Sequence, residues 1–254
     1  LVEKAFSKEM AQYLIEFINS IEKSVDYYEE KFENWVLMLK LKFYDKDKII
    51  MSTRKNLFNS NNRDFVLNYY KENDYVEYVK LLEEIILLNI EEYVKQDYIE
   101  KLIEIYKKEN NKDDYERIVK LNYTLFPNID NYLLIKNMYE PKEWLKLRNS
   151  YILPYKQHIR LYIDLCFEEN MDEEVFETLN NLDVDYLNCY VDKLKLIDMN
   201  RASLLYKNKV VESAEHCYNG RKSYEIIVQN LLKLYNLERN MQDVEEVIKL
   251  FRDK

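Results

Sequence analysis

The sequence is almost free of glycine. Its 254 residues include one glycine, Gly220, and three prolines, whereas average usage of about 7% would place about 18 glycines in such a chain. Sandwiches, barrels and doubly wound sheets need many turn residues at positive φ, which glycine adopts most easily. Loops that bind phosphate through the backbone also depend on glycine. The composition therefore excludes P-loop and Rossmann-type nucleotide sites and predicts an all-α fold.

Asparagine is expected to replace glycine at the ends of helices. It is one of the few other residues that tolerate the left-handed conformation after a helix. Asparagines occur where the apolar pattern places helix ends: Asn61–Asn62, Asn73, Asn110–Asn111, Asn170 and Asn240.

Residues suited to catalysis or metal binding are few. The chain has two histidines, His158 and His216, and no C-x-x-C or H-x-x-x-H spacing, so neither a catalytic triad nor a zinc site is indicated. His158 is expected at the surface, at the start of a helix. His216 is adjacent to Cys217. Neighbouring side chains on a helix point about 100° apart, so we do not expect these two residues to form one site. We expect a non-enzymatic protein with no cofactor and no metal.

The three cysteines and the lengths of the apolar runs indicate in which cellular compartment the protein is expected. Cys166, Cys189 and Cys217 each lie within an apolar helical pattern, which predicts buried free thiols and a reducing, cytoplasmic environment. No apolar run approaches the roughly 18 residues of a membrane span, so no membrane contact is expected. The sequence begins at Leu1 and stops within a helical pattern, so we expect it to be part of a longer protein.

The charge is unevenly distributed. The formal net charge is −9, which makes the chain a poor general ligand for nucleic acid. Residues 1–200 carry 28 basic and 39 acidic side chains, and residues 201–254 carry 10 and 8. The candidate basic surface near the C-terminus consists of Lys207, Lys209, Arg221 and Lys222. A solvated helix face is the alternative that we favour for it.

Apolar residues recur at helical spacing almost throughout, and no segment shows the sustained alternation of a β-strand. Two of the clearest stripes are Ile159, Tyr162, Ile163, Cys166, Phe167 and Tyr224, Ile227, Val228, Leu231, Tyr235. The pattern predicts fifteen helices: Ser7–Ser24, Tyr27–Phe43, Lys46–Asn59, Arg63–Glu72, Tyr75–Asn89, Glu92–Glu109, Asp113–Phe126, Asp130–Met138, Lys142–Tyr151, His158–Glu169, Asp172–Leu182, Val184–Asp198, Arg201–Asn219, Lys222–Glu238 and Gln242–Asp253.

A weak repeat marks the turns between helices. The motif N-x-x-D-aromatic/aliphatic-E-x-aliphatic begins at Asn111 and Asn240, and a related form begins at Asn170. The asparagines from Asn73 onward are 38, 59 and 70 residues apart, and the longer intervals fit doubled units of about 30–35 residues, the tetratricopeptide range. We predict an irregular right-handed α-solenoid of tetratricopeptide-like hairpins over residues 61–254, preceded by a helical cap over residues 1–60.

Two other features have simple structural interpretations. The acidic clusters Asp113–Asp114 and Asp172–Glu174 are expected in the first turns of helices, where they complement the helix dipole. The 24 tyrosines are assigned mainly to the core, for example Tyr106, Tyr162, Tyr190 and Tyr235. A partner surface rich in tyrosine is the alternative, because tyrosine is common at interaction hot spots.

The C-terminal third resembles a known family. Residues 214–224 (AEHCYNGRKSY), the run V-x-x-L-L-K from Val228 and the run from Val244 to Lys254 are similar to the end of bacterial SWIM zinc-finger proteins. That family is defined by a C-x-C…C-x-H zinc motif, which this chain lacks, so no zinc ligand is transferred to any residue here. The resemblance implies a metal-free helical region of a larger protein, whose DNA- or protein-binding finger would precede Leu1.

These observations favour a protein-interaction scaffold that binds an unidentified protein or peptide. One alternative is a nucleic-acid-associated regulator that uses the basic C-terminal surface, although direct nucleic-acid binding by this chain is not expected. The other is a peptide-sensing helical-repeat domain, which a concave, asparagine-lined groove would favour.

Overall fold

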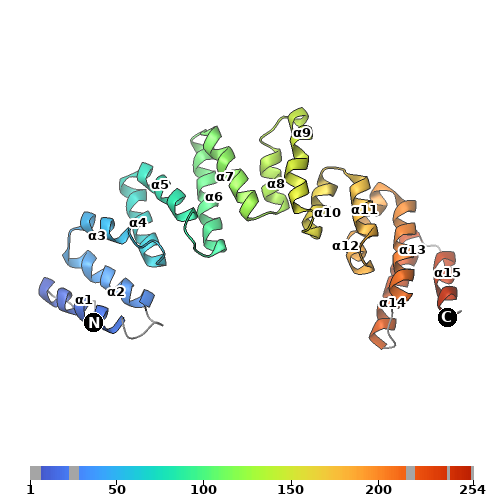
Figure 1. The fold of residues 1–254 in the computed structure, drawn as a ribbon, viewed down its shortest axis with the longest axis horizontal. Helices are drawn as coiled ribbons and strands as arrows, with labels where there is room; N and C mark the ends of the chain where they lie inside the picture. Colours follow the sequence, from blue (N-terminus) through green and yellow to red (C-terminus); the bar gives the residue numbers. More distant parts are fainter. Residues whose placement is uncertain (1–6, 23–28, 216–220, 239–240, 253–254) are drawn as a thin grey trace. The chain divides into compact units, whose positions relative to one another are not determined.

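The chain folds entirely into helices and their connections within the residues that the computed structural model describes, which are 7–22, 29–215, 221–238 and 241–252 (Figure 1). The prediction of an all-α fold is therefore confirmed. The chain divides into two compact units, residues 1–127 and 128–254. The predicted boundary at residue 60 falls inside the first unit, and a separate cap over residues 1–60 stays a prediction.

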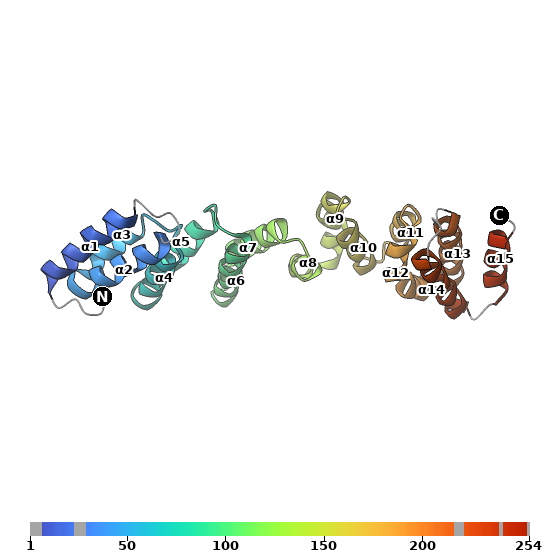
Figure 2. The same cartoon turned by 90° about the horizontal axis from the view of Figure 1, so that it is seen from below.

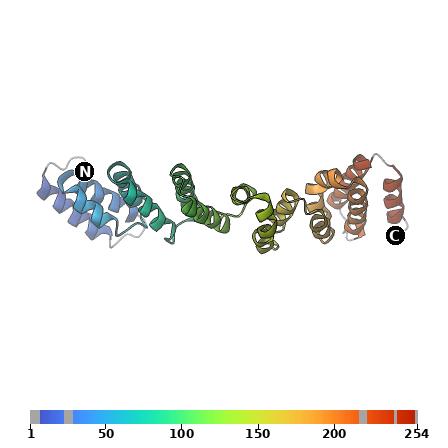
Figure 3. The same ribbon diagram turned by 90° about the horizontal axis from the view of Figure 1, so that it is seen from above.

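Consecutive helices pack against each other in the first unit. Its helices are α1 (Lys8–Glu22), α2 (Glu29–Phe43), α3 (Lys46–Thr53), α4 (Ser60–Asn73), α5 (Tyr75–Ile86), α6 (Glu92–Lys108) and α7 (Lys112–Leu125). Each contacts the next, and α2 also contacts α4. The pairing of α6 with α7 can be followed in Figures 1 and 3.

The second unit repeats this arrangement. Its elements are α8 (Ile129–Lys136), α9 (Pro141–Ile152), the 3-10 turn η3 (Leu153–Tyr155), α10 (Ile159–Glu168), α11 (Asp172–Asn180), α12 (Val184–Ile197), α13 (Met199–Glu215), α14 (Arg221–Glu238) and α15 (Met241–Arg252). Neighbours in sequence pack together, as Figure 2 shows for α12 and α13. In addition, α8 contacts α10 and α13 contacts α15, so helices two apart in sequence also meet.

Asparagine replaces glycine at the ends of α6 and α10, whereas Asn61 and Asn62 lie in the first turn of α4 and not at a break between helices as predicted. Asn110 (φ 54°) and Asn170 (φ 52°) are the residues with positive φ in the described part of the chain. After Asn110, the N–H of Asn111 donates to the carbonyl of Tyr106 at 3.0 Å, a bond typical of a helix closed by a left-handed residue. Asn240 lies outside the described residues.

The acidic clusters lie where they were predicted. Asp113 and Asp114 occupy the first turn of α7, and Asp172–Glu174 the first turn of α11. The Asn111 side chain caps α7 by accepting from the N–H of Asp114 at 3.3 Å. The acidic residues therefore complement the dipoles of α7 and α11, whereas the side-chain cap of α7 comes from Asn111 and α11 has no side-chain cap.

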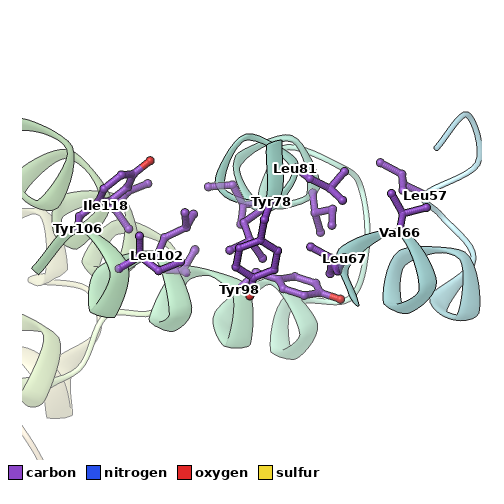
Figure 4. Close-up of a cluster of buried hydrophobic side chains, with 14 of the residues drawn as sticks. Leu57, Val66, Leu67, Tyr78, Leu81, Tyr98, Leu102, Tyr106 and Ile118 are labelled. Atoms are coloured by element: carbon purple, nitrogen blue, oxygen red, sulfur yellow. The ribbon is translucent and has the colours of Figure 1, made fainter. Parts of the chain in front are cut away.

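The larger described core of the first unit extends from Ile50 on α3 to Ile118 on α7 and is rich in leucine, isoleucine and tyrosine (Figure 4). Its members include Leu81, Leu102 and Ile118, each fully buried. A smaller cluster around Ala11 and Leu39 joins α1 to α2. The two clusters are distinct: the smaller one involves α1 and α2, and the larger one begins with Ile50 on α3.

The assignment of tyrosines to the core is confirmed for several residues and modified for one. Tyr106, Tyr162 and Tyr190 are 5%, 3% and 6% exposed, and Tyr235 is half-buried. A tyrosine side chain can be buried without burying a charge, because the phenol is neutral below about pH 10. The aromatic content therefore serves packing to a large extent.

The stripe predicted for α14 does not all face the core. Val228 is 54% exposed, whereas Asn230, Leu234 and Leu237 are buried. The Nδ2 of Asn188 on α12 donates to Oδ1 of Asn230 at 3.1 Å. That polar contact and the packing on α13 and α15 turn a different face of α14 inward.

Candidate functional site

A row of hollows in the first unit is lined by residues of α2 together with α1, α3 and the starts of α4 and α6. It consists of three hollows of about 570, 240 and 470 Å³. The first two share Lys40 and Ser52 as lining residues, and the last two share Glu33 and Asn56. The α2 side of the lining therefore runs in order from Phe43 back to Glu33. We call these three hollows together the N-terminal groove.

The first hollow combines an apolar floor with lysines. Its lining residues are Lys8, Gln12, Ile15, Glu16, Lys40, Phe43, Tyr44, Asp45, Lys48, Ile49 and Ser52. Ile49 is 4% exposed, and Ile15 and Phe43 are half-buried. The Lys8 ammonium lies 4.9 Å from the centre of the Tyr44 ring, a cation–π distance.

The second hollow is lined mainly by amides and hydroxyls. Its residues are Asn19, Glu33, Val36, Leu37, Lys40, Ser52, Thr53, Asn56 and Asn62. The Asn62 Nδ2 donates to the backbone carbonyl of Asn56 at 3.0 Å, which uses one of its two amide hydrogens. A carboxamide has two donors and one acceptor oxygen, so this row of side chains suits the alternating N–H and C=O groups of a peptide backbone.

The third hollow has an aromatic rim. Its lining residues are Glu33, Asn56, Phe58, Asn59, Ser60, Arg63, Glu91, Tyr93 and Val94. Phe58 is 62% exposed and Tyr93 is 71% exposed. Aromatic groups so exposed are available for contact with a partner's apolar side chains.

The floor of the groove depends on a loop that was predicted as helix. The predicted helix Lys46–Asn59 is wrong beyond Thr53, where α3 ends. Arg63 is 4% exposed, and its Nη1 donates to the carbonyls of Leu57 and Phe58 at 2.9 and 2.7 Å. These carbonyls therefore bond to a buried guanidinium rather than to a following helical turn.

Glu33 ties the same loop to α2. Its Oε1 accepts from Asn56 Nδ2 at 3.0 Å, and its Oε2 accepts from Asn59 Nδ2. The Asn59 Oδ1 also accepts from the N–H of Asn62 at 3.1 Å and so caps α4. The loop is held at both ends, which gives the groove a defined wall.

The residues considered for catalysis are dispersed. No group of three or more His, Cys, Asp or Glu side chains suited to a metal ion occurs in the described part of the chain. His158 is exposed at the start of α10, as predicted. Cys166 is buried, and burial raises the pKa of its thiol to about 11. Cys189 is exposed, which corrects the prediction of a buried thiol, and Cys217 lies outside the described residues.

The candidate basic surface is partly neutralised. The Lys207 ammonium lies 2.6 Å from an Asp243 oxygen and 2.5 Å from a Glu246 oxygen of α15. Lys209 pairs with Glu212 at 2.7 Å. The side chains of Arg221 and Lys222 lie outside the described residues. Carboxylates therefore accompany both of the described lysines.

A buried polar cluster in the second unit was not anticipated from the sequence. The Glu169 side chain is 4% exposed and accepts from the indole N–H of Trp144 at 3.1 Å. Lys136 lies 2.8 Å away, and Arg148 lies 3.8 Å from the other carboxylate oxygen. The residues come from α8, α9 and the end of α10, so their sequence spacing carries no signal of the cluster.

The N-terminal groove was likewise missed. The sequence does contain a signal, because four asparagines lie between Asn56 and Asn62. Treating these asparagines as residues typical of helix ends explains only that Asn59 caps α4. Their position opposite α2 depends on the tertiary packing.

Comparison with known proteins gives no relative. No protein-family model, no curated protein and no solved structure matches this sequence. Within the helices that the structure describes, none is both long and apolar enough to cross a membrane.

Proposed function

We propose that this chain is a non-catalytic, cytoplasmic protein-interaction scaffold that binds an extended peptide segment of a partner in the N-terminal groove. The observation that carries the proposal is the row of three hollows, with amide and hydroxyl side chains in the middle one. This is the feature expected of the peptide-sensing alternative, so the two hypotheses converge on one surface.

The dimensions of the groove support a short peptide. The lining extends over eleven residues of α2, from Glu33 to Phe43, and the ten steps between them correspond to about 15 Å at 1.5 Å per residue. An extended peptide rises about 3.3 Å per residue, so the groove accommodates about four or five residues. Apolar groups at both ends, including Ile49 and Phe58, can contact side chains of the peptide.

The proposed architecture is an irregular right-handed α-solenoid of tetratricopeptide-like hairpins. Packing of consecutive helices and the contacts between α2 and α4, α8 and α10, and α13 and α15 support it, because stacked hairpins bring alternate helices together. We also propose that the array belongs to a larger SWIM-like protein. A C-x-C…C-x-H element in the coding sequence before Leu1 would support that relationship, and its absence would contradict it.

Nucleic-acid association is less well supported. The proposed surface would need free lysines, and Lys207 and Lys209 have carboxylate partners. A gel-shift assay at low salt should therefore show no complex with duplex DNA.

The experiment is selection of short random peptides on the immobilised chain, followed by measurement of their affinity by fluorescence anisotropy. Ser52 lies at the junction of the first two hollows, so Ser52→Trp should block the groove and weaken binding by about tenfold or more. Ser150→Trp is the matched control. Both serines are exposed, and each donates to the carbonyl three residues earlier, at 2.8 and 2.6 Å.

The two possible failures have different meanings. Absence of any enriched peptide would contradict peptide binding. Equal binding by Ser52→Trp and the unmodified chain would place the peptide outside the N-terminal groove and refute the assigned site.

A further inference from the structure

The first hollow of the N-terminal groove contains lysines without acidic partners among the described residues. Lys8, Lys40 and Lys48 line it, and none of them makes an ion pair with a described carboxylate. Lys80 and Lys120 do pair with glutamates, whereas exposed lysines such as Lys71 and Lys107 have no ion pair among the described residues; what distinguishes Lys8, Lys40 and Lys48 is that all three line one hollow. The three ammonium groups are therefore available to an incoming anion.

The carboxylates of the same hollow already have hydrogen-bond donors. Asp45 caps α3 by accepting from the N–H of Asp47 at 2.9 Å, and Glu16 accepts from Gln12 Nε2 at 3.3 Å. Three lysines against two carboxylates leave the lining with one excess positive charge. The local charge balance thus favours a ligand with a negative group.

The wider charge distribution points the same way. Residues 1–60 carry 10 basic and 10 acidic side chains, whereas residues 61–254 carry 28 and 37. The net charge of −9 therefore arises entirely after residue 60. An acidic ligand is repelled least by the part of the chain that forms most of the groove.

The hollow also selects for an apolar group. Ile15, Phe43 and Ile49 lie among the lysines, and Ile49 is almost fully buried. The lysine stems add methylene surface to this floor. A ligand gains most here if it places an aliphatic or aromatic side chain in the hollow and a carboxylate beside the ammonium groups.

We infer that the partner segment is an acidic peptide, in which an Asp or Glu lies within one or two residues of a large apolar side chain that enters the first hollow. This inference rests on the proposed peptide-binding function and specifies its ligand. The carboxylate is recognised by Lys8, Lys40 and Lys48, while the amides of the second hollow bind the adjoining backbone.

The test uses the full chain and a library of random peptides of about ten residues, twice the length that the groove accommodates. We expect enriched sequences to combine an acidic and an apolar residue. Lys8→Gln/Lys40→Gln/Lys48→Gln should bind them about tenfold more weakly or worse. The matched control carries the same change at three exposed lysines elsewhere in the unit, Lys71, Lys107 and Lys108, and should bind normally.

The salt dependence of the unmodified chain provides a measurement that does not depend on the folding of a variant. Affinity for an enriched acidic peptide should fall as salt rises, because exposed charges are screened. Enriched peptides that lose binding to Ser52→Trp but lack acidic residues, or that bind the lysine variant equally well, would overturn the inference and leave the proposed function intact. Failure to enrich any peptide would overturn both.

Discussion

The buried carboxylate of Glu169 should be a main source of stability in the second unit, and its removal tests the packing of α8, α9 and α10. Glu169→Ala leaves the Trp144 indole N–H, which is inside the core, without its acceptor. It also removes the carboxylate that lies 2.8 Å from Lys136 and 3.8 Å from Arg148. The free energy of unfolding should fall substantially.

The magnitude follows from what each partner retains. Breaking a buried ion pair costs about 3–5 kcal/mol, and an unsatisfied buried donor costs about 1–3 kcal/mol. Lys136 keeps Glu168 at 2.9 Å, and its side chain and that of Arg148 are 29% and 27% exposed, so solvent offsets part of the loss. We expect a decrease of about 3 kcal/mol for Glu169→Ala. Glu169→Gln keeps an acceptor for the indole and should cost about half as much.

The assay is urea unfolding followed by tryptophan fluorescence. The chain has two tryptophans, so Trp35→Phe leaves Trp144 as the reporter of the second unit. The neighbouring Glu168→Ala serves as control, because its side chain is 35% exposed and a surface pair contributes about 1 kcal/mol or less. A Glu169→Ala variant within about 1 kcal/mol of the parent, or no more affected than Glu168→Ala, would refute the reasoning.

Three further predictions concern the helix end, the thiols and the tyrosines. Asn170→Ala should lower the melting temperature by an amount corresponding to about 1 kcal/mol, because alanine is disfavoured at the positive φ of this position. Asn170→Gly should be neutral or stabilising, because glycine adopts positive φ without steric cost. Equal effects of the two substitutions would show that the positive φ is not what matters at this position. In a Cys217→Ala background, a thiol reagent at pH 8 should modify exposed Cys189 and leave Cys166, whose pKa burial raises to about 11, unreacted until the chain unfolds; early labelling of Cys166, located by mass spectrometry, would count against its burial. Burial also raises the pKa of Tyr190 to about 12, so its contribution to stability is full below pH 10, the unfolded value, and is lost as pH rises toward 12. The urea midpoint should therefore fall over that range and fall less in Tyr190→Phe; an unchanged pH dependence would show that Tyr190 does not contribute.

Much of the helical structure could be predicted, because its causes are local. The 3.6-residue apolar period marks helices wherever they occur, and the start of α12 at Val184 matches the predicted residue. Asn110 and Asn170 can end their helices because asparagine, unlike most residues other than glycine, tolerates positive φ. The first-turn acids Asp113 and Asp172 are explained by the positive end of the helix dipole.

Predictions that required knowledge of distant contacts were less successful. The segment after Thr53 leaves the helix because Arg63 and Glu33 bond to it, and neither partner is apparent from its periodicity. Cys189 belongs to an apolar stretch, yet α12 turns it outward. On α14, Asn230 faces inward although Val228 is the more apolar residue.

The sequence by itself therefore determines the class of fold. A chain with one glycine and apolar residues at helical spacing throughout can bury its apolar surface only by packing helices together. The choice of which face meets which neighbour belongs to the folded state, because it depends on groups far apart in the chain. Glu33 and Asn56 are 23 residues apart, and Trp144 and Glu169 are 25 apart. The N-terminal groove and the buried Glu169 cluster exist only once such groups are brought together.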